Sequence, residues 1–322
     1  MYDLPIAAQF NQQHLLTLTS WSPEEIGYAL EMALRMKKNP KAASQWLADK
    51  FLVCIFAKPS LRTRVSFEAG MAQLGGRVMT MTEGEIGLGV REPVPDIAKV
   101  LSRMADGIMI RTFEQETVVA LAKHGSIPVI NGLTDAYHPC QALADILTFL
   151  EIKGGLKGKK LAFVGDGNNV AASLLIISAK LGLNIAIGHA PGYAPDADVI
   201  EAARKCAEVS GAVITLTTDP AEAVAGADAV YADIWASMGQ ESQRAARMRD
   251  FANYRVTNEL MGKAKPDAIF LHCLPAHRGE EVTTTVIDGE QSRVFDQAEN
   301  RLHAQKAVLA LLLGGKRLDD IG

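Results

Sequence analysis

The residues of this sequence best suited to chemistry on an anion stand together in one short segment. Ser60, Leu61, Arg62, Thr63 and Arg64 follow an apolar run and open a helical pattern. A helix start presents free backbone N–H groups and the positive end of the helix dipole, which suits phosphate. Ser60 and Thr63 add hydroxyl groups, and Arg62 adds a guanidinium that can bind two oxygens at once. A capped helix with surface arginines would give the same pattern, so the segment alone leaves both interpretations open.

Apolar runs of strand length alternate with helical stretches around this segment. A helix is predicted after Ser22, where Pro23 and Glu25 complete a capping box. Alternation of this kind is typical of a parallel sheet with helices on both faces. Strands are predicted over residues 51–56, 78–81, 107–110 and 127–130, and helices over 64–74, 97–104 and 117–124.

A second alternating series follows a long amphipathic helix that is predicted to begin near His138. Its strands are predicted over residues 160–164, 185–187, 213–216, 229–232 and 268–271. We therefore predict an α/β protein with two doubly wound parallel-sheet domains, over residues 1–150 and 151–322. The last helix, over residues 297–314, could pack back on the first domain. Ligands are expected in the cleft between the domains, beyond the carboxyl ends of the strands.

Composition limits the class of protein. The chain has 322 residues, 48% of them hydrophobic, and a formal net charge of −4. This length allows two hydrophobic cores, and the acidic balance argues against a nucleic-acid-binding protein. The chain start lacks a basic region followed by a long apolar run, and no segment is long and apolar enough for a membrane span, so we expect a cytoplasmic protein. Four widely spaced cysteines without a CxxC pair favour neither a disulfide framework nor a zinc site.

Four segments resemble, in the same order, the signatures of the aspartate/ornithine carbamoyltransferases and of their ornithine branch in particular. The segment Ser60–Arg64 resembles the carbamoyl phosphate signature of this family, and His138–Gln141 resembles the HPCQ motif that contacts the carbamoyl group. Asp233–Gly239 resembles the loop ending in Ser-Met-Gly that holds the amino acid, and His272–Pro275 resembles the HCLP motif. The resemblance runs through most of the chain, from about residue 56 to residue 304.

The resemblance implies a set of residues that bind carbamoyl phosphate. They are Ser60, Leu61, Arg62, Thr63, Arg111, His138, Gln141, Cys273, Leu274 and Arg301. Such a set agrees with the chemistry, because negative charge develops on the former carbonyl oxygen during carbamoyl transfer and cationic donors stabilise it. Taken alone, His138 would more often cap a helix, and Arg111 would more often lie at a surface strand end. Neither explanation accounts for their joint appearance beyond successive strand ends.

The resemblance also implies an amino acid as the second substrate, bound by Asn169, Asp233, Ser237 and Met238. Its side-chain amine has a pKa of about 10.4, whereas the attacking nucleophile must be neutral. Asp233 and Cys273 follow predicted strands and are expected to converge on this amine. With Arg111 and His138 they are the expected catalytic residues. A strand cysteine is more commonly an inert buried thiol, and whether Cys273 acts as a base or only contacts the ligand stays open.

The implied activity is transfer of the carbamoyl group to the δ-amine of ornithine, giving citrulline and phosphate, in arginine biosynthesis or arginine catabolism. It needs neither a metal nor a cofactor. Related transferases that use acetylornithine or putrescine are the nearest alternatives, and a non-catalytic carbamoyl-phosphate-binding protein is the alternative from another class. The turn at Gly165 resembles a dinucleotide fingerprint, but Val170 stands where the third glycine belongs, so a nucleotide-dependent oxidoreductase is only a fold-level alternative.

The family usually forms trimers with shared active sites, so a homotrimer or a multiple of trimers is implied. A mobile loop of the family crosses into the neighbouring subunit's site and corresponds here to residues 83–96. Gly87 stands there in place of a frequent glutamine, and Leu61 replaces a frequent threonine of the phosphate signature. These departures leave the acceptor amine open, and a plain surface loop is the simpler interpretation of residues 83–96.

Overall fold

The computed structural model describes residues 2–237 and 239–321, which form two compact units. The N-terminal unit comprises residues 4–147 and 299–321, and the C-terminal unit comprises residues 148–298 together with residues 2 and 3. The division falls inside two helices, α6 (Pro139–Lys153) and α13 (Val294–Leu312). Each unit contains one parallel sheet, in the strand orders β2-β1-β3-β4 and β7-β6-β5-β8-β9. The predicted α/β fold class with two parallel sheets is therefore confirmed.

The sheet of the N-terminal unit agrees with the predicted strands to within three residues at each end. Its strands are β1 (Phe51–Phe56), β2 (Arg77–Thr82), β3 (Gly107–Arg111) and β4 (Val129–Leu133). Its further helices are α1 (Pro23–Lys38), α2 (Leu61–Gln73), α3 (Glu83–Ile86), α4 (Val94–Leu101), α5 (Gln115–His124) and the 3-10 turn Leu318–Asp320. The capping box predicted for α1 is confirmed, because Ser22 and Glu25 exchange hydrogen bonds with each other's backbone N–H groups.

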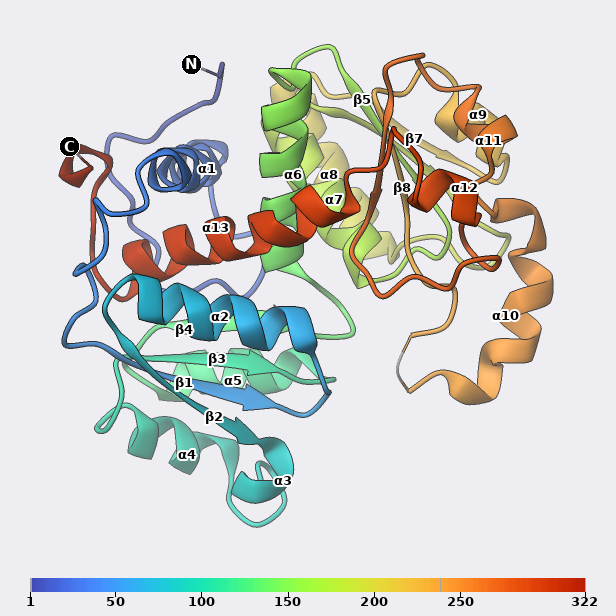
Figure 1. Ribbon diagram of the computed structural model, residues 1–322. Coiled ribbons are helices and arrows are strands. Elements are labelled where there is room, and N and C mark those ends of the chain that lie inside the picture. Colours follow the sequence, from blue (N-terminus) through green and yellow to red (C-terminus); the bar gives the residue numbers. More distant parts are fainter. Residues whose placement is uncertain (1, 238, 322) are drawn as a thin grey trace. The chain divides into compact units, whose positions relative to one another are not determined.

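Alternate residues of β1 and β3 face opposite sides of this sheet. Val53, Ile55, Ile108 and Ile110 form one hydrophobic cluster with side chains of α4 and α5. Figure 1 shows α2 on the opposite face of the strands. The helices thus cover both faces, as expected for a parallel sheet, and ligands of such sheets bind beyond the carboxyl ends of the strands.

The sheet of the C-terminal unit is formed by β5 (Lys160–Val164), β6 (Asn184–Gly188), β7 (Ile214–Thr217), β8 (Ala229–Ala232) and β9 (Ile269–His272). Its longer helices are α7 (Asn169–Leu181) and α8 (Ala197–Ser210). The shorter ones are α9 (Pro220–Val224), α10 (Arg244–Asp250), α11 (Asn258–Met261) and α12 (Thr284–Ile287), with 3-10 turns over Glu241–Gln243 and Ala252–Tyr254.

One face of this second sheet packs against the short helices. Val164, Val230 and Phe270 share a hydrophobic cluster with side chains of α9, α11 and α12. In Figure 1, α7 and α8 lie on the other face, so this sheet is also covered on both sides. Among the helices of the described residues, none is long and apolar enough to cross a membrane.

Candidate active site

In the N-terminal unit, the predicted phosphate residues follow three adjacent strands. Ser60 follows β1 and caps α2, where its hydroxyl oxygen accepts a hydrogen bond from the N–H of Thr63 at 3.3 Å. Arg111 is the last residue of β3, and His138 follows β4 directly before α6. Because β1, β3 and β4 are neighbours in the sheet, their carboxyl ends bring these side chains together.

Thr63 and Gln141 connect this group to the last long helix. The guanidinium of Arg301 donates to the hydroxyl of Thr63 at 3.1 Å and to the amide oxygen of Gln141 at 2.7 Å. Arg111 also donates to the hydroxyl of Thr63, at 3.4 Å. All four side chains are buried, as is His138. Two cationic side chains that meet at one hydroxyl group repel each other, so an anion bound there would relieve an existing cost.

The electrostatics of this cluster favour a neutral imidazole at His138. Burial lowers the pKa of His138 well below its ordinary value, and the nearby cations Arg301, Arg111 and Arg62 lower it further. A neutral ring can donate a hydrogen bond to a carbonyl oxygen without bringing a further charge. The neighbouring Cys140 is a different case, since burial raises the pKa of its thiol to about 12 and keeps it protonated.

Lys58 connects the loops that follow the same three strands. Its ammonium group lies 2.5 Å from a carboxylate oxygen of Asp135, in the loop after β4. It also lies 4.0 Å from the ring centroid of Phe113, which follows β3. Lys58 itself follows β1 and is buried. The lysine therefore connects all three loops, although the sequence motif gave no reason to single it out.

In the C-terminal unit, the predicted acceptor residues follow the adjacent strands β5, β8 and β9. Asp233 follows β8, is buried, and accepts three hydrogen bonds through its carboxylate. The donors are the thiol of Cys273 at 3.0 Å, the amide of Asn168 at 2.7 Å and the backbone N–H of Ile234 at 2.8 Å. The predicted convergence of Asp233 and Cys273 is thus present in the structure.

The turn after β9 is fixed by a buried histidine. Nδ1 of His272 accepts a hydrogen bond from the backbone N–H of Leu274 at 2.9 Å, so the ring proton of a neutral imidazole lies on Nε2. Nε2 lies 3.2 Å from the carboxylate of Glu281. Leu274 has a φ of 57°, which is uncommon for a side chain of its kind. Cys273 and Leu274, which were also predicted to touch carbamoyl phosphate, thus belong to the unit that carries Asp233.

Two groups of described side chains have spacing that could suit a metal ion: Asp233, His272 and Cys273, and His277, Glu280 and Glu281. In the first group, both ring nitrogens of His272 already have partners within the protein, and the thiol of Cys273 donates to Asp233. A metal there would have to displace these hydrogen bonds.

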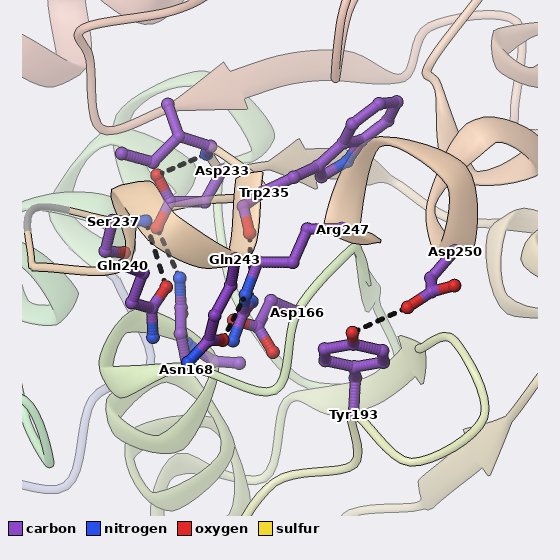
Figure 2. A network of polar contacts seen from close by, with 12 residues as sticks. Asp166, Asn168, Tyr193, Asp233, Trp235, Ser237, Gln240, Gln243, Arg247 and Asp250 are labelled. Carbon is purple, nitrogen blue, oxygen red and sulfur yellow. Dashed lines mark hydrogen bonds and ion pairs between the residues drawn. The ribbon is translucent and has the colours of Figure 1, made fainter. Parts of the chain in front are cut away.

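A buried ion pair lies next to the loop that follows Asp233, as Figure 2 shows. The guanidinium of Arg247 lies 2.6 Å from the carboxylate of Asp166 and donates to the backbone oxygen of Trp235 at 2.9 Å. Burial raises the pKa of Asp166, while Arg247 acts in the opposite direction. The ring of Tyr193 lies 5.0 Å from this guanidinium. Arg247 therefore ties the turn after β5 to the loop after β8.

The remaining predicted acceptor residues lie around the same turn and loop. Asn169 is the first residue of α7, directly after the turn that carries Asp166. The backbone N–H of Ser237 donates to the side-chain oxygen of Gln240 at 3.0 Å, also visible in Figure 2. Met238, the other predicted residue of this loop, lies outside the described residues.

The segment 83–96, which corresponds to the mobile loop of the family, contains a compact turn. Gly87 ends α3 in the left-handed conformation, with a φ of 68°, and its carbonyl oxygen accepts hydrogen bonds from three following N–H groups, those of Val90, Arg91 and Glu92. A Cβ atom at Gly87 would lie 2.7 Å from Cβ of Arg91, so a glutamine at this position would be crowded as well as strained. Arg91 is exposed at this turn.

Two family models match most of the chain. One, described as "Aspartate/ornithine carbamoyltransferase, carbamoyl-P binding domain", matches residues 13–151. The other, described as "Aspartate/ornithine carbamoyltransferase, Asp/Orn binding domain", matches residues 157–312.

Similar proteins cover nearly the whole chain. An ornithine carbamoyltransferase of Anoxybacillus flavithermus is 52% identical over 313 residues, which cover 97% of this chain and 100% of that protein. One from Bacillus subtilis is 55% identical over 299 residues and covers 93% of each chain. Among solved structures, the ornithine carbamoyltransferase of Pyrococcus furiosus is 49% identical with a TM-score of 0.93, covering 97% of this chain and 100% of that one.

Proposed function

The chain belongs to the aspartate/ornithine carbamoyltransferase family, and on this basis we propose that it transfers the carbamoyl group of carbamoyl phosphate to the δ-amine of L-ornithine, giving L-citrulline and phosphate. The observation that carries this proposal is the buried cluster in which Arg111 and Arg301 meet at Thr63 beside a neutral His138. Such a cluster suits a ligand with a dianionic phosphate and a carbonyl oxygen that gains negative charge.

Each predicted donor residue has a physical role in this proposal. The helix start at Ser60 and Leu61 offers backbone N–H groups to the phosphate, and Arg62 adds cationic donors. Arg111 contacts both the phosphate and the carbonyl oxygen, where charge develops. His138, in its neutral form, donates to the same carbonyl oxygen, and Gln141 holds the amide group of the carbamoyl moiety. Arg301 is supplied by α13 and closes the cluster through Thr63 and Gln141.

The acceptor residues supply the opposite charge. The carboxylate of Asp233 attracts the protonated δ-amine, and Cys273 contacts the same amine. Asn169, Ser237 and Met238 hold the α-amino and α-carboxylate groups, and Leu274 contacts the carbamoyl moiety from the turn after Cys273. Once the amine has lost a proton to the carboxylate of Asp233, its nitrogen attacks the carbonyl carbon and a C–N bond forms. The C–O bond to phosphate then breaks, and the phosphate leaves with the electron pair and takes up the second proton that the nitrogen releases.

The subunits are proposed to form a homotrimer. Large apolar side chains of the N-terminal unit are exposed in the single chain, among them Leu61 and Val65 on α2, Met79 on β2 and Val90 in the segment 83–96. Contacts between subunits would remove such surface from water. Light scattering should then give three times the chain mass of 34.6 kDa, or a multiple of that value.

The activity is tested with carbamoyl phosphate and a panel of amines: ornithine, acetylornithine and putrescine. Phosphate release and ureido product are measured together, so that hydrolysis of carbamoyl phosphate is distinguished from transfer. We expect stoichiometric citrulline and phosphate with ornithine. Turnover with acetylornithine or putrescine alone would show that the acceptor is wrong, and turnover with none of them would show that the chain is not a transferase of this kind.

A further inference from the structure

We propose that Asn168 is a positioning residue of the acceptor site: its amide group holds the carboxylate of Asp233 in the orientation that receives the amine. The inference rests on the function proposed above. Asn168 is half-buried at the start of α7 and directly precedes Asn169, which the resemblance to the family implies as a residue that binds the amino acid. In Figure 2 its side chain reaches from the start of the helix toward Asp233.

Two sets of hydrogen bonds fix the orientation of this amide. Oδ1 of Asn168 accepts from the backbone N–H groups of Val170 at 3.0 Å and Ala171 at 3.2 Å, which caps α7. An amide oxygen that accepts from two N–H groups leaves the NH₂ group directed the other way, and Nδ2 lies 2.7 Å from Oδ2 of Asp233. The cap therefore assigns oxygen and nitrogen without ambiguity, and it aims a donor at the carboxylate.

Asn168 caps a helix that is held in place by its packing. α7 has thirteen residues, and those from Val170 to Lys180 are buried. The turn before it is tightly packed, because a Cβ atom at Gly167 would lie 2.2 Å from the backbone nitrogen of Pro195. A donor held on such an element cannot follow Asp233 if the carboxylate rotates, so the hydrogen bond selects one orientation.

The other two contacts of Asp233 involve its second oxygen. Oδ1 accepts from the thiol of Cys273 and from the N–H of Ile234. Asn168 thus contacts Oδ2, and with the two contacts at Oδ1 it restrains the carboxylate at both of its oxygens. If the donor is lost, Oδ1 keeps its contacts with Cys273 and Ile234, but Oδ2 loses its restraint and the carboxylate can turn as far as the Oδ1 contacts allow.

The capping role and the positioning role can be separated by substitution. Serine caps helices about as well as asparagine but has no N–H donor that could reach Asp233 while its oxygen caps the helix. In Asn168→Ser we therefore expect a melting temperature within about 2 °C of the wild type. We expect kcat/KM for ornithine to fall about tenfold or more, as for loss of one hydrogen bond to a charged group, with carbamoyl phosphate affinity unchanged.

Asn168→Asp retains a capping oxygen but places a second carboxylate against Asp233. We expect a larger loss, about a hundredfold in kcat/KM for ornithine, because two adjacent carboxylates repel each other. The acidic limb of the pH profile should move to higher pH, since a carboxylate beside another one holds a proton more tightly. The matched control is Asp219→Ser, which exchanges the cap of α9 and leaves Asp233 untouched; its kinetic constants should equal those of the wild type.

Wild-type kcat/KM for ornithine in Asn168→Ser would overturn the proposal, since capping alone would then explain Asn168. Failure of the function itself is a separate result, in which the wild-type protein does not carbamoylate ornithine. The alkylation rate of Cys273 by iodoacetamide then decides, with Cys206 as internal reference, because the thiol of Cys273 donates to Asp233. A severalfold change in Asn168→Ser supports the positioning role, and an unchanged rate rejects it.

Discussion

Both units place their functional side chains beyond three adjacent strands, β1, β3 and β4 in one and β5, β8 and β9 in the other, yet the two sets differ in charge. In the N-terminal unit, arginines converge on the hydroxyl of Thr63. In the C-terminal unit, the carboxylate of Asp233 is surrounded by three donors. The arginine cluster carries a positive charge that a bound anion would balance. The carboxylate of Asp233 carries a negative charge and already accepts hydrogen bonds from donors of the protein.

This difference in charge corresponds to two ways in which a protein can prepare a binding site. The arginine cluster is held by buried side chains that repel each other, so its stability improves when an anion binds. The proposed acceptor site is held by hydrogen bonds within the unit, so an arriving amine would find the carboxylate already oriented. Substitutions in the first set should therefore act on carbamoyl phosphate, and those in the second on ornithine.

Removal of a phosphate cation should have the largest effect. In Arg62→Ala we expect kcat/KM for carbamoyl phosphate to fall about a thousandfold, because a charge-assisted contact to the dianion is lost in both the ground state and the transition state. Calorimetry and initial rates measure this effect. Arg64→Ala is the matched control, since Arg64 pairs with Glu68 on the exposed side of α2. An unchanged carbamoyl phosphate affinity in Arg62→Ala would show that this cluster of the N-terminal unit does not bind the phosphate.

Neutralising the acceptor carboxylate should give the next largest effect, and on the other substrate. In Asp233→Asn we expect kcat to fall about a hundredfold and KM for ornithine to rise, because an amide neither attracts an ammonium group nor takes its proton. The dissociation constant of carbamoyl phosphate, measured by calorimetry without ornithine, should not change. Equal losses for both substrates would mean that the division of labour between the units is wrong.

The ion pair behind the acceptor site gives a prediction about stability. Arg247→Met leaves the largely buried carboxylate of Asp166 without its cation, which should lower the free energy of unfolding by about 3 kcal/mol. Urea denaturation measures this loss. Arg244→Met, one turn earlier on α10, removes a more exposed pair with Glu280 and should cost less than about 1 kcal/mol. Comparable losses in the two variants would show that the Arg247 pair does not support the acceptor loop.

The sequence predicted the fold for physical reasons that are local, whereas the site residues were implied by the resemblance to the family. Strands and helices follow from apolar periodicity, and the cap of α1 follows from Ser22 and Glu25, which lie within one helical turn. The resemblance implied Arg111 and His138 as site residues, and both lie at the same edge of one sheet because residues after parallel strands share that edge.

The residues that the sequence did not single out depend on contacts over long separations. Arg247 is one of several arginines between residues 244 and 255, and its partner Asp166 is 81 positions away. Asn168 had a local signal, since an asparagine before an apolar helix is a typical N-cap. Its second contact, with Asp233, could not be predicted because it depends on how β5 and β8 pair.

A smaller effect concerns the charge state of the N-terminal cluster. Because the pKa of His138 is lowered in the folded protein, the unfolded chain binds more protons below about pH 6.5. Stability should therefore fall as the pH drops through this window toward the folded pKa, by up to about 1.4 kcal/mol per pH unit. His138→Gln should remove this contribution, leaving the slope that His14 and His303 give through their own lowered pKa values. Urea denaturation at pH 6.5 and 5.5 gives the change in the free energy of unfolding between the two pH values. The same change in the wild type and in His138→Gln would contradict a neutral His138.

The smallest effect is expected at Leu61, where the sequence departs from the phosphate signature. The side chain of Leu61 is 73% exposed at the first position of α2, so it points into solvent in the single chain. What this position offers an anion is its backbone N–H, which a threonine would also offer. Leu61→Thr should therefore change the carbamoyl phosphate dissociation constant by less than about twofold. If Leu61→Thr bound carbamoyl phosphate about ten times more tightly or more, the phosphate would lie within reach of a hydroxyl group at position 61. The contact at this position would then involve the side chain and not only the backbone N–H.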